Sequence, residues 1–361
     1  MKKQVALLSG LLAAVMLLTA CGGAGKTTDP SASASASEAA VSTLAPAEPP
    51  YVPEFVNPLT GLAEEEDVSG NRPVAVMLNN LKKALPQCGV SRADIIYEAP
   101  AEGGITRMMG VFQSVEGVGE IGTVRSARPY YVELAMGLDA IYLHAGGSPG
   151  AYSIIKKFGV SALDCVNGPY EGTLFWRDAT RRKTAGLEHS VLTSSEKITR
   201  LFPTYTSLRK THADGYVCPL NFTDEAALDG GTAETVTIRY SNYKTGVFRY
   251  DAGSRNYLVE EYGAPYVDAN NGEQVEVRNV LIVQTDVNPI KGDSAGRLTV
   301  RLTGTGSGFF ACGGKYVPIT WSKAAEDQPM YFFDAAGNPL SLEAGRSYIN
   351  IVSTTYPVTM E

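Results

Sequence analysis

Short, mainly apolar runs bounded by turn-forming residues recur between residue 73 and the middle of the chain. They cover residues 73–78, 93–98, 106–113 and 138–144. Runs of this length are typical of buried strands. Pro129 precedes an apolar segment at residues 130–136, and Pro149 begins another that ends at 158. Because proline is favoured in the first turn of a helix, both segments are predicted to be helical.

A different pattern begins at Gly230-Gly231. Residues 234–240 alternate between apolar and polar side chains, which is typical of a strand with one solvent-facing side. Further strands are predicted at residues 246–251, 256–260, 275–284, 297–302, 314–321, 330–333 and 348–352. We therefore expect two domains. Residues 57–229 should form an α+β or α/β domain with a mixed sheet, and residues 230–361 an all-β, sandwich-like domain.

The first twenty residues have the pattern of a secretory signal peptide. Lys2 and Lys3 precede an apolar run at residues 5–18 that is too short to span a membrane comfortably. The tetrapeptide that ends at Cys21 resembles the lipobox of bacterial lipoproteins. This resemblance implies cleavage before Cys21 and lipidation of its thiol; the alternative is a plain signal peptide cut elsewhere. Residues 21–56, rich in Ser, Ala and Pro, are predicted to be a flexible tether.

Composition narrows the function classes. The 361 residues include 31 Lys and Arg against 38 Asp and Glu, and the formal charge of −7 argues against nucleic acid as a partner. With three histidines and no closely spaced cysteine pairs, we expect neither a metal nor another cofactor. Cys88, Cys165, Cys218 and Cys312 are expected to be free thiols, with a Cys165–Cys218 disulfide as the alternative.

Three arginines within 22 positions suggest an anion site. Arg107, Arg125 and Arg128 each carry a planar guanidinium suited to carboxylate or phosphate. Alternatively, each pairs with an acid such as Glu98, Glu102 or Glu133 in a structural network.

A glycine loop between a predicted strand and a predicted helix is the second candidate. Its N–H groups can face an anion at the helix N-terminus, although Ser148 can equally act as a simple helix cap. The predicted ligand-binding residues are Arg107, Arg125, Ser126, Arg128, His144, Gly146, Gly147 and Ser148.

Catalysis is a further possibility in the same region. Glu98 and Glu102 are candidates for acid–base chemistry, and His144 and His189 for proton transfer, as in a hydrolase of cell-wall glycan, peptide or phosphodiester. The alternatives are structural roles: the glutamates position the arginines, and the histidines pack at strand ends. No nucleophile elbow is present in the sequence.

Several dense motifs occur in order along the chain. They are Asn57-Pro-Leu-Thr-Gly61, Arg72-Pro73, Asn79-Asn80, Pro86-Gln87, Glu102-Gly-Gly-Ile-Thr-Arg107, Arg125-Ser-Ala-Arg-Pro129 and His144-Ala-Gly-Gly-Ser-Pro149. Together they resemble the YerB-like lipoproteins of Gram-positive bacteria, over residues 57–352. The sequence departs from that pattern at Leu85, where the family usually has Arg, and at Ser190, where it usually has Asn.

The resemblance implies a two-domain lipoprotein on the outer face of the cell membrane, in a family of undetermined activity. Combined with the candidate residues, it leads us to expect an envelope protein that binds an anionic or glycan ligand. A cell-wall polymer or another envelope protein is the expected partner. An envelope hydrolase and a structural or partner-docking lipoprotein are the alternatives.

Overall fold

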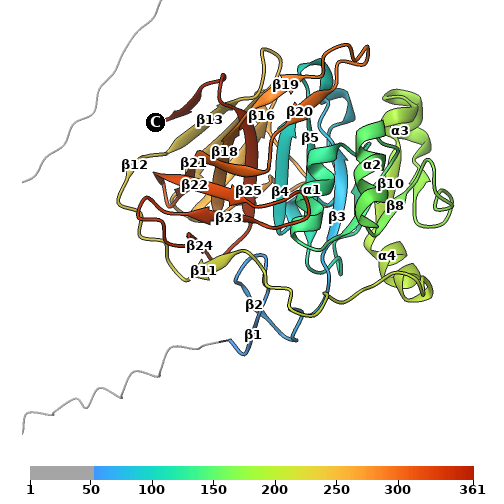
Figure 1. The fold of residues 1–361 in the computed structure, drawn as a ribbon, viewed down its shortest axis with the longest axis horizontal. Coiled ribbons are helices and arrows are strands. Elements are labelled where there is room, and N and C mark those ends of the chain that lie inside the picture. The colour runs from blue at the N-terminus through green and yellow to red at the C-terminus, as the bar shows by residue number, and fades with distance from the viewer. Residues whose placement is uncertain (1–52) are drawn as a thin grey trace, which may run out of the picture. The chain divides into compact units, whose positions relative to one another are not determined.

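A long mixed sheet runs through residues 53–361, the part of the chain that the computed structural model describes (Figure 1). From edge to edge its strands are β12 (Gly231–Thr232), β22 (Lys315–Lys323), β21 (Gly304–Cys312), β18 (Asn279–Thr285), β25 (Ser347–Ser353), β4 (Ile95–Pro100), β5 (Thr106–Phe112), β3 (Val74–Asn79), β7 (Ile141–His144) and β8 (Ala162–Asp164). Strand β23 (Met330–Phe333) pairs with β22. The predicted signal peptide and nearly all of the predicted tether lie outside the described residues.

Strand β25 joins the N-terminal and C-terminal parts of this sheet. It pairs in parallel with β18 on one side and with β4 on the other. All seven of its residues are buried, as expected for a strand covered on both faces. The sheet is therefore continuous across residue 230, and the division into two domains at that point stays a prediction.

Two helices cover one face of the sheet. Helix α1 (Pro129–Gly137) and helix α2 (Pro149–Phe158) both begin at the predicted prolines. Tyr131 of α1 and Ala151 of α2 pack in one apolar cluster with Met77 of β3. The cluster holds alternate residues of the strands, because successive side chains of a strand point to opposite faces.

A second sheet packs on the opposite face. Its strands are β16 (Ala264–Pro265), β15 (Asn256–Glu261), β14 (Thr245–Asp251), β13 (Thr235–Arg239) and β26 (Val358–Met360), with β17 (Glu276–Val277) paired to β15. In β13, Val236 and Ile238 are buried and their neighbours are not, as the alternation of the sequence predicts. These two residues share an apolar cluster with Ile282 of β18, so the C-terminal region stacks two sheets.

Smaller elements complete the fold. Strands β6 (Glu120–Gly122), β10 (Val191–Ser194) and β9 (Trp176–Arg177) form a third sheet, beside helices α3 (Ala179–Thr184) and α4 (Ser195–Leu201). The short strand pairs are β1 (Phe55–Val56) with β2 (Ala63–Glu64), β11 (Asn221–Thr223) with β24 (Ser341–Glu343), and β19 (Val287–Pro289) with β20 (Leu298–Val300). The short 3₁₀ helices are η1 (Lys82–Ala84), η2 (Val90–Arg92), η3 (Glu102–Gly104), η4 (Leu187–His189) and η5 (Phe202–Thr204).

The described residues are thus mostly β, and their α-helices all lie between positions 129 and 201. Within the same residues, no helix is both long and apolar enough to cross a membrane. The four cysteines after residue 53 are free thiols, so the alternative Cys165–Cys218 disulfide is absent from the structure.

The strand directions place several loops at one edge of the central sheet. Strands β3, β7 and β8 are mutually parallel, and β4 shares their direction because both β3 and β4 run antiparallel to β5. Their carboxyl ends therefore meet at one edge, which we call the carboxyl edge. Open α/β sheets bind ligands outside this kind of edge.

Candidate functional site

The predicted site residues gather at the carboxyl edge, where they form separate groups with different chemistry. Arg107 is the second residue of β5 there, Glu98 lies two residues before the end of β4, and His144 is the last residue of β7. Arg125 is tied to the same edge because its backbone N–H donates to the carbonyl of Met77 in β3.

Glu102 holds two of the three predicted arginines. Its Oε1 accepts from Nη2 of Arg107 at 2.6 Å and from Nη2 of Arg128, and its Oε2 accepts from Nε of Arg128 at 3.0 Å. Burial alone would raise the pKa of Glu102, but the hydrogen bond from Arg128 and both positive charges lower it to about 2. Arg107 and Arg128 are buried and paired, so little of their charge is free for a ligand.

Glu98 lies in a second group, which we call the sealed cluster: Glu98, Lys244 and Glu261. All three side chains are at most 1% exposed. Nζ of Lys244 lies 3.1 Å from Oε1 of Glu98 and closer still to Oε2 of Glu261. Thr106 and Tyr348 donate further hydrogen bonds to Glu98 at 2.5 Å each. The carboxylate of Glu98 is therefore saturated with donors and shielded from solvent.

Two atoms in and beside this cluster lack partners among residues 53–361. They are Oε1 of Glu261 and Oδ1 of Asn80, the residue whose NH₂ group donates to Glu98. Burial and the nearby charge of Glu98 raise the pKa of Glu261, although Lys244 and a hydrogen bond from Asn80 oppose the shift. A single proton on Glu261 would make the cluster electrically neutral, since one lysine then faces one carboxylate.

The glycine loop after β7 already holds an anion from its own chain. Oδ1 of Asp164 accepts from the backbone N–H of Gly146 at 2.7 Å and of Val166 at 2.8 Å. Nδ1 of His144 lies 2.8 Å from the carbonyl of Gly146, and burial lowers the pKa of His144. Of the predicted backbone donors, the N–H of Gly146 is therefore occupied by Asp164, and the N–H of Ser148 donates to the carbonyl of Ala127.

The end of that loop has a local structural role. Oγ of Ser148 accepts from the N–H of Ala151 at 3.2 Å and caps helix α2. Gly147 forms a bridge with Ala127, which anchors the loop to the segment that carries the arginines. These contacts match the capping alternative for Ser148.

Arg125 lines an open cleft of about 410 Å³. The lining residues are Lys83, Val124, Arg125, Ser126, Ala145, Gly146, Val166, Arg177, Ala185, Gly186, Leu187, Glu188 and Val191. Three of them are positively charged and one is negative, so the cleft has a local excess of two positive charges. Of the predicted ligand-binding residues, Arg125, Ser126 and Gly146 line it; the others do not. We call this cavity the Arg125 cleft.

The charges of the Arg125 cleft are only partly paired. Arg125 donates from Nη2 to the Glu188 carboxylate at 2.9 Å and from Nη1 to the Glu188 carbonyl at 3.2 Å, but its Nε is buried without a partner. Arg177 pairs with Glu171 at 2.9 Å. Lys83 is exposed and forms no ion pair among the described residues.

His189 lies directly beside this cleft. Its ring is fully buried, with Nδ1 2.6 Å from the amide nitrogen of Asn79. Its Nε2 lies 3.2 Å from Oε1 of Glu188 yet makes no hydrogen bond. Burial and the charges of Arg125 and Lys83 lower the pKa of His189, so the ring is neutral at pH 7.

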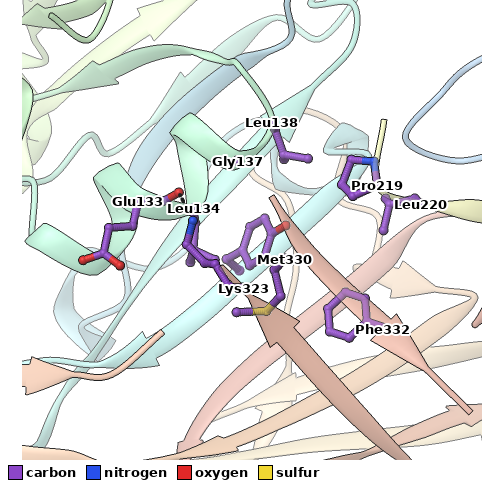
Figure 2. Close-up of a pocket in the computed structure, with 10 residues that line it drawn as sticks. Glu133, Leu134, Gly137, Leu138, Pro219, Leu220, Lys323, Met330 and Phe332 are labelled. Carbon is purple, nitrogen blue, oxygen red and sulfur yellow. Dashed lines mark hydrogen bonds between the residues drawn. The ribbon is translucent and has the colours of Figure 1, made fainter. Parts of the chain in front are cut away.

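Another buried ionisable side chain, Lys323, lies far from the arginines in sequence. Figure 2 shows Lys323 extending from β22 toward helix α1, beside Leu134. Its Nζ donates to the main-chain carbonyls of Glu133 at 3.4 Å and of Glu326 at 2.9 Å. Burial lowers the pKa of Lys323 to about 8 and raises that of Glu133 to about 7. The cavity there is only about 10 Å³, too small for a ligand, so these contacts hold α1 against β22.

Sequence reasoning did not single out Lys83, Arg177 or Glu188 as cleft residues, nor Lys244 and Glu261 as a buried pair. The sequence around each of these residues resembles that of an ordinary solvent-exposed segment and contains no recognisable motif. Glu188 is adjacent to the predicted His189, and that adjacency was the one available signal.

Comparison with known proteins defines the class to which this architecture belongs. Residues 59–208 match the family model described as "Protein of unknown function (DUF3048) N-terminal domain", and residues 236–349 match "Protein of unknown function (DUF3048) C-terminal domain". The chain belongs to this family. The Arg125 cleft lies in the first matched segment, whereas the sealed cluster draws Glu98 from the first and Lys244 and Glu261 from the second.

One relative within that class is the "Putative lipoprotein YerB" of Bacillus subtilis (strain 168). It is 34% identical over 299 residues, which cover 82% of this chain and 85% of the relative. The crystal structure of YerB protein from Bacillus subtilis matches with a TM-score of 0.71 at 30% identity, covering 84% of this chain and 99% of that one. The resemblance to the YerB-like family is thereby confirmed.

Proposed function

We propose that this protein is a lipid-anchored envelope protein, held at the outer face of the cell membrane by a lipidated Cys21. The Leu18-Thr-Ala-Cys21 sequence, the Ser/Ala/Pro-rich segment after it and the lipoprotein name of the relative support the proposal. We further propose that residues 57–229 are an α+β domain and residues 230–361 a sandwich-like β domain, despite the sheet that they share.

The anchor can be tested with C21S. Removal of the lipid attachment thiol is expected to move the protein from the membrane fraction to the culture medium, because no other lipid anchor is then available. Immunoblots of the two fractions would measure the shift, with C88S as the matched cysteine control. Retention of C21S in the membrane fraction to the same extent as C88S would contradict the lipid anchor.

The folded part is proposed to bind an anionic ligand in the Arg125 cleft. The single observation that carries this proposal is the excess of positive charge around a cleft of about 410 Å³, in which Nε of Arg125 has no partner. A charged guanidinium with a spare donor favours a carboxylate or phosphate. Among the described residues no aromatic side chain lines the cleft, so a neutral sugar ring would lack a stacking surface.

Hydrolysis is less well supported by the geometry. Glu98 is sealed from solvent, and Glu102 is held ionised by two arginines, so neither is placed to exchange a proton with a substrate. Ligand binding in the Arg125 cleft is therefore the function that the geometry supports best.

R125Q tests the binding proposal. Loss of a charge-assisted donor is expected to weaken binding of inorganic phosphate and of 3-methylbutanoate, a small aliphatic carboxylate, at least about tenfold. Isothermal titration of the detergent-extracted protein at low ionic strength would measure the change. R200Q is the control, since Arg200 is exposed on α4 and does not line the cleft. If wild type, R125Q and R200Q all titrate alike, the cleft is not the binding site.

A further inference from the structure

Glu188 occupies the place in the Arg125 cleft where an anionic ligand would be expected. Its Oε2 accepts from Arg125 at 2.9 Å, and its Oε1 lies 3.2 Å from Nε2 of His189. The Glu188 side chain is nevertheless 58% exposed, whereas Arg125 is 15% exposed and His189 is fully buried. An exposed acid thus faces a mostly buried guanidinium and a buried imidazole.

The hydrogen bonds of Asn79 define which nitrogen of His189 carries the proton. Oδ1 of Asn79 accepts from the backbone N–H of Leu81 at 3.1 Å, which leaves the NH₂ group of Asn79 facing Nδ1 of His189. Nδ1 is therefore an acceptor, and in the neutral ring the proton resides on Nε2. That N–H is buried and makes no hydrogen bond. A buried donor without an acceptor is costly, so an acceptor that reaches it gains more than an ordinary hydrogen bond.

We propose that Glu188 is a displaceable internal occupant of the cleft, and that a ligand carboxylate replaces it on Arg125 and also accepts a hydrogen bond from the Nε2–H of His189. This inference rests on the proposed function and extends it by naming the ligand group and its two contacts. The displaced Glu188 side chain is free to turn into solvent, where its charge is fully hydrated.

The rest of the cleft indicates what the carboxylate should be attached to. Val124, Val166 and Val191 line the cleft beside Arg125, and Ala145 and Ala185 add further small apolar surface. Oε2 of Glu188 lies on Arg125 and its Oε1 lies 3.2 Å from Nε2 of His189, so the two donors lie within the span of one carboxylate group. The ligand class is therefore a carboxylate on a short aliphatic group.

E188A tests the displacement directly. Wild-type protein must break the Glu188–Arg125 pair to bind 3-methylbutanoate, and E188A does not. We expect E188A to bind this probe about tenfold more tightly than wild type in isothermal titration. E171A is the matched control, because it removes the same charge from the neighbouring Glu171–Arg177 pair without uncovering Arg125 or His189. Equal tightening in both variants would mean that charge alone acts, and would overturn the displacement.

A second measurement reports on His189 in wild-type protein and needs no further variant. On addition of 3-methylbutanoate, the ¹⁵N and ¹H resonances of the Nε2–H group should shift as it gains an acceptor; inorganic phosphate serves as the competing anion and should cause a smaller shift. An unchanged His189 signal while the probe binds would also overturn the inference. If R125Q weakens binding but E188A does not strengthen it, the proposed function stands and the displacement fails. If no variant changes binding, both fail.

Discussion

The sealed cluster and the Arg125 cleft both combine basic and acidic side chains near the carboxyl edge of the central sheet. One of them is closed to solvent and the other is open. In the sealed cluster, Lys244 lies between two carboxylates and the three side chains are closed off from solvent. In the cleft, Arg125 meets a single carboxylate whose side chain is more than half exposed.

The difference lies in how completely each charge is paired. Lys244 is contacted by two acids, so it joins the two family-matched segments and leaves nothing for a ligand. The donors of Arg125 and His189 exceed the acceptors around them, so they are available. Burial of a charge is therefore a poor guide to function by itself, whereas buried donors without acceptors beside an open cleft indicate a binding site.

The largest expected effect comes from the same substitution made in each region. K244M leaves Glu98 and Glu261 without their common partner, and loss of one member of a buried ion pair costs about 3–5 kcal/mol of unfolding free energy. K83M removes an exposed lysine of the cleft and should change stability by less than about 0.5 kcal/mol. Urea unfolding at pH 7 would measure both. Similar losses of unfolding free energy in K244M and K83M would contradict the distinction between the sealed cluster and the Arg125 cleft.

The strands and two helices were largely predictable because their signals are local. Residues 73–78 are a continuous apolar run, residues 93–98 contain the apolar segment Ile95-Ile-Tyr97, and Pro149 marks the start of α2. The position of β25 between β18 and β4 was not predictable, since pairing between residues about 250 positions apart leaves no trace in local periodicity. Strand β21 was not predicted, because its glycines Gly304, Gly306 and Gly308 are typical of loops. In the structure, Gly306 lies against Trp321 and Gly308 lies against the Ile282 carbonyl.

The candidate site was predictable only in part, for a similar reason. Arg125, Ser126 and Gly146 stand in unusual motifs, and they line the cleft. The partners that decide what each residue does come from elsewhere in the chain. Glu102 pairs with Arg107 and Arg128, and Asp164 accepts from the glycine loop. Which arginine lines the open cleft depends on these three-dimensional contacts.

The smallest expected effect tests the protonation of the sealed cluster. Oε1 of Glu261 is buried without a partner among the described residues, and burial beside Glu98 raises the pKa of Glu261, so we expect Glu261 to carry a proton; a glutamine at this position imitates the protonated acid. E261Q should therefore stay within about 1 kcal/mol of wild type at pH 6. A penalty as large as that of K244M would mean that Glu261 is ionised and that Lys244 needs both carboxylates.

The difference in unfolding free energy between wild type and E261Q should also change with pH, in a direction that the pKa of Glu261 determines. Because the pKa of Glu261 is raised in the folded protein, the unfolded chain releases this proton first as the pH rises. The stability that Glu261 contributes is fully present below its ordinary pKa of about 4.3 and is lost as the pH rises toward the folded value. Wild type should thus lose stability relative to E261Q between about pH 5 and pH 9, as measured by urea unfolding at several pH values. The unfolding free energy of E188Q relative to wild type should have the opposite pH dependence. Because the hydrogen bond and charge of Arg125 lower the pKa of Glu188, the small stability that Glu188 contributes is present above about pH 5 and is lost only in acid. A flat difference for E261Q over this range would place both carboxylates of the sealed cluster in the ionised form and make its chemistry like that of the cleft.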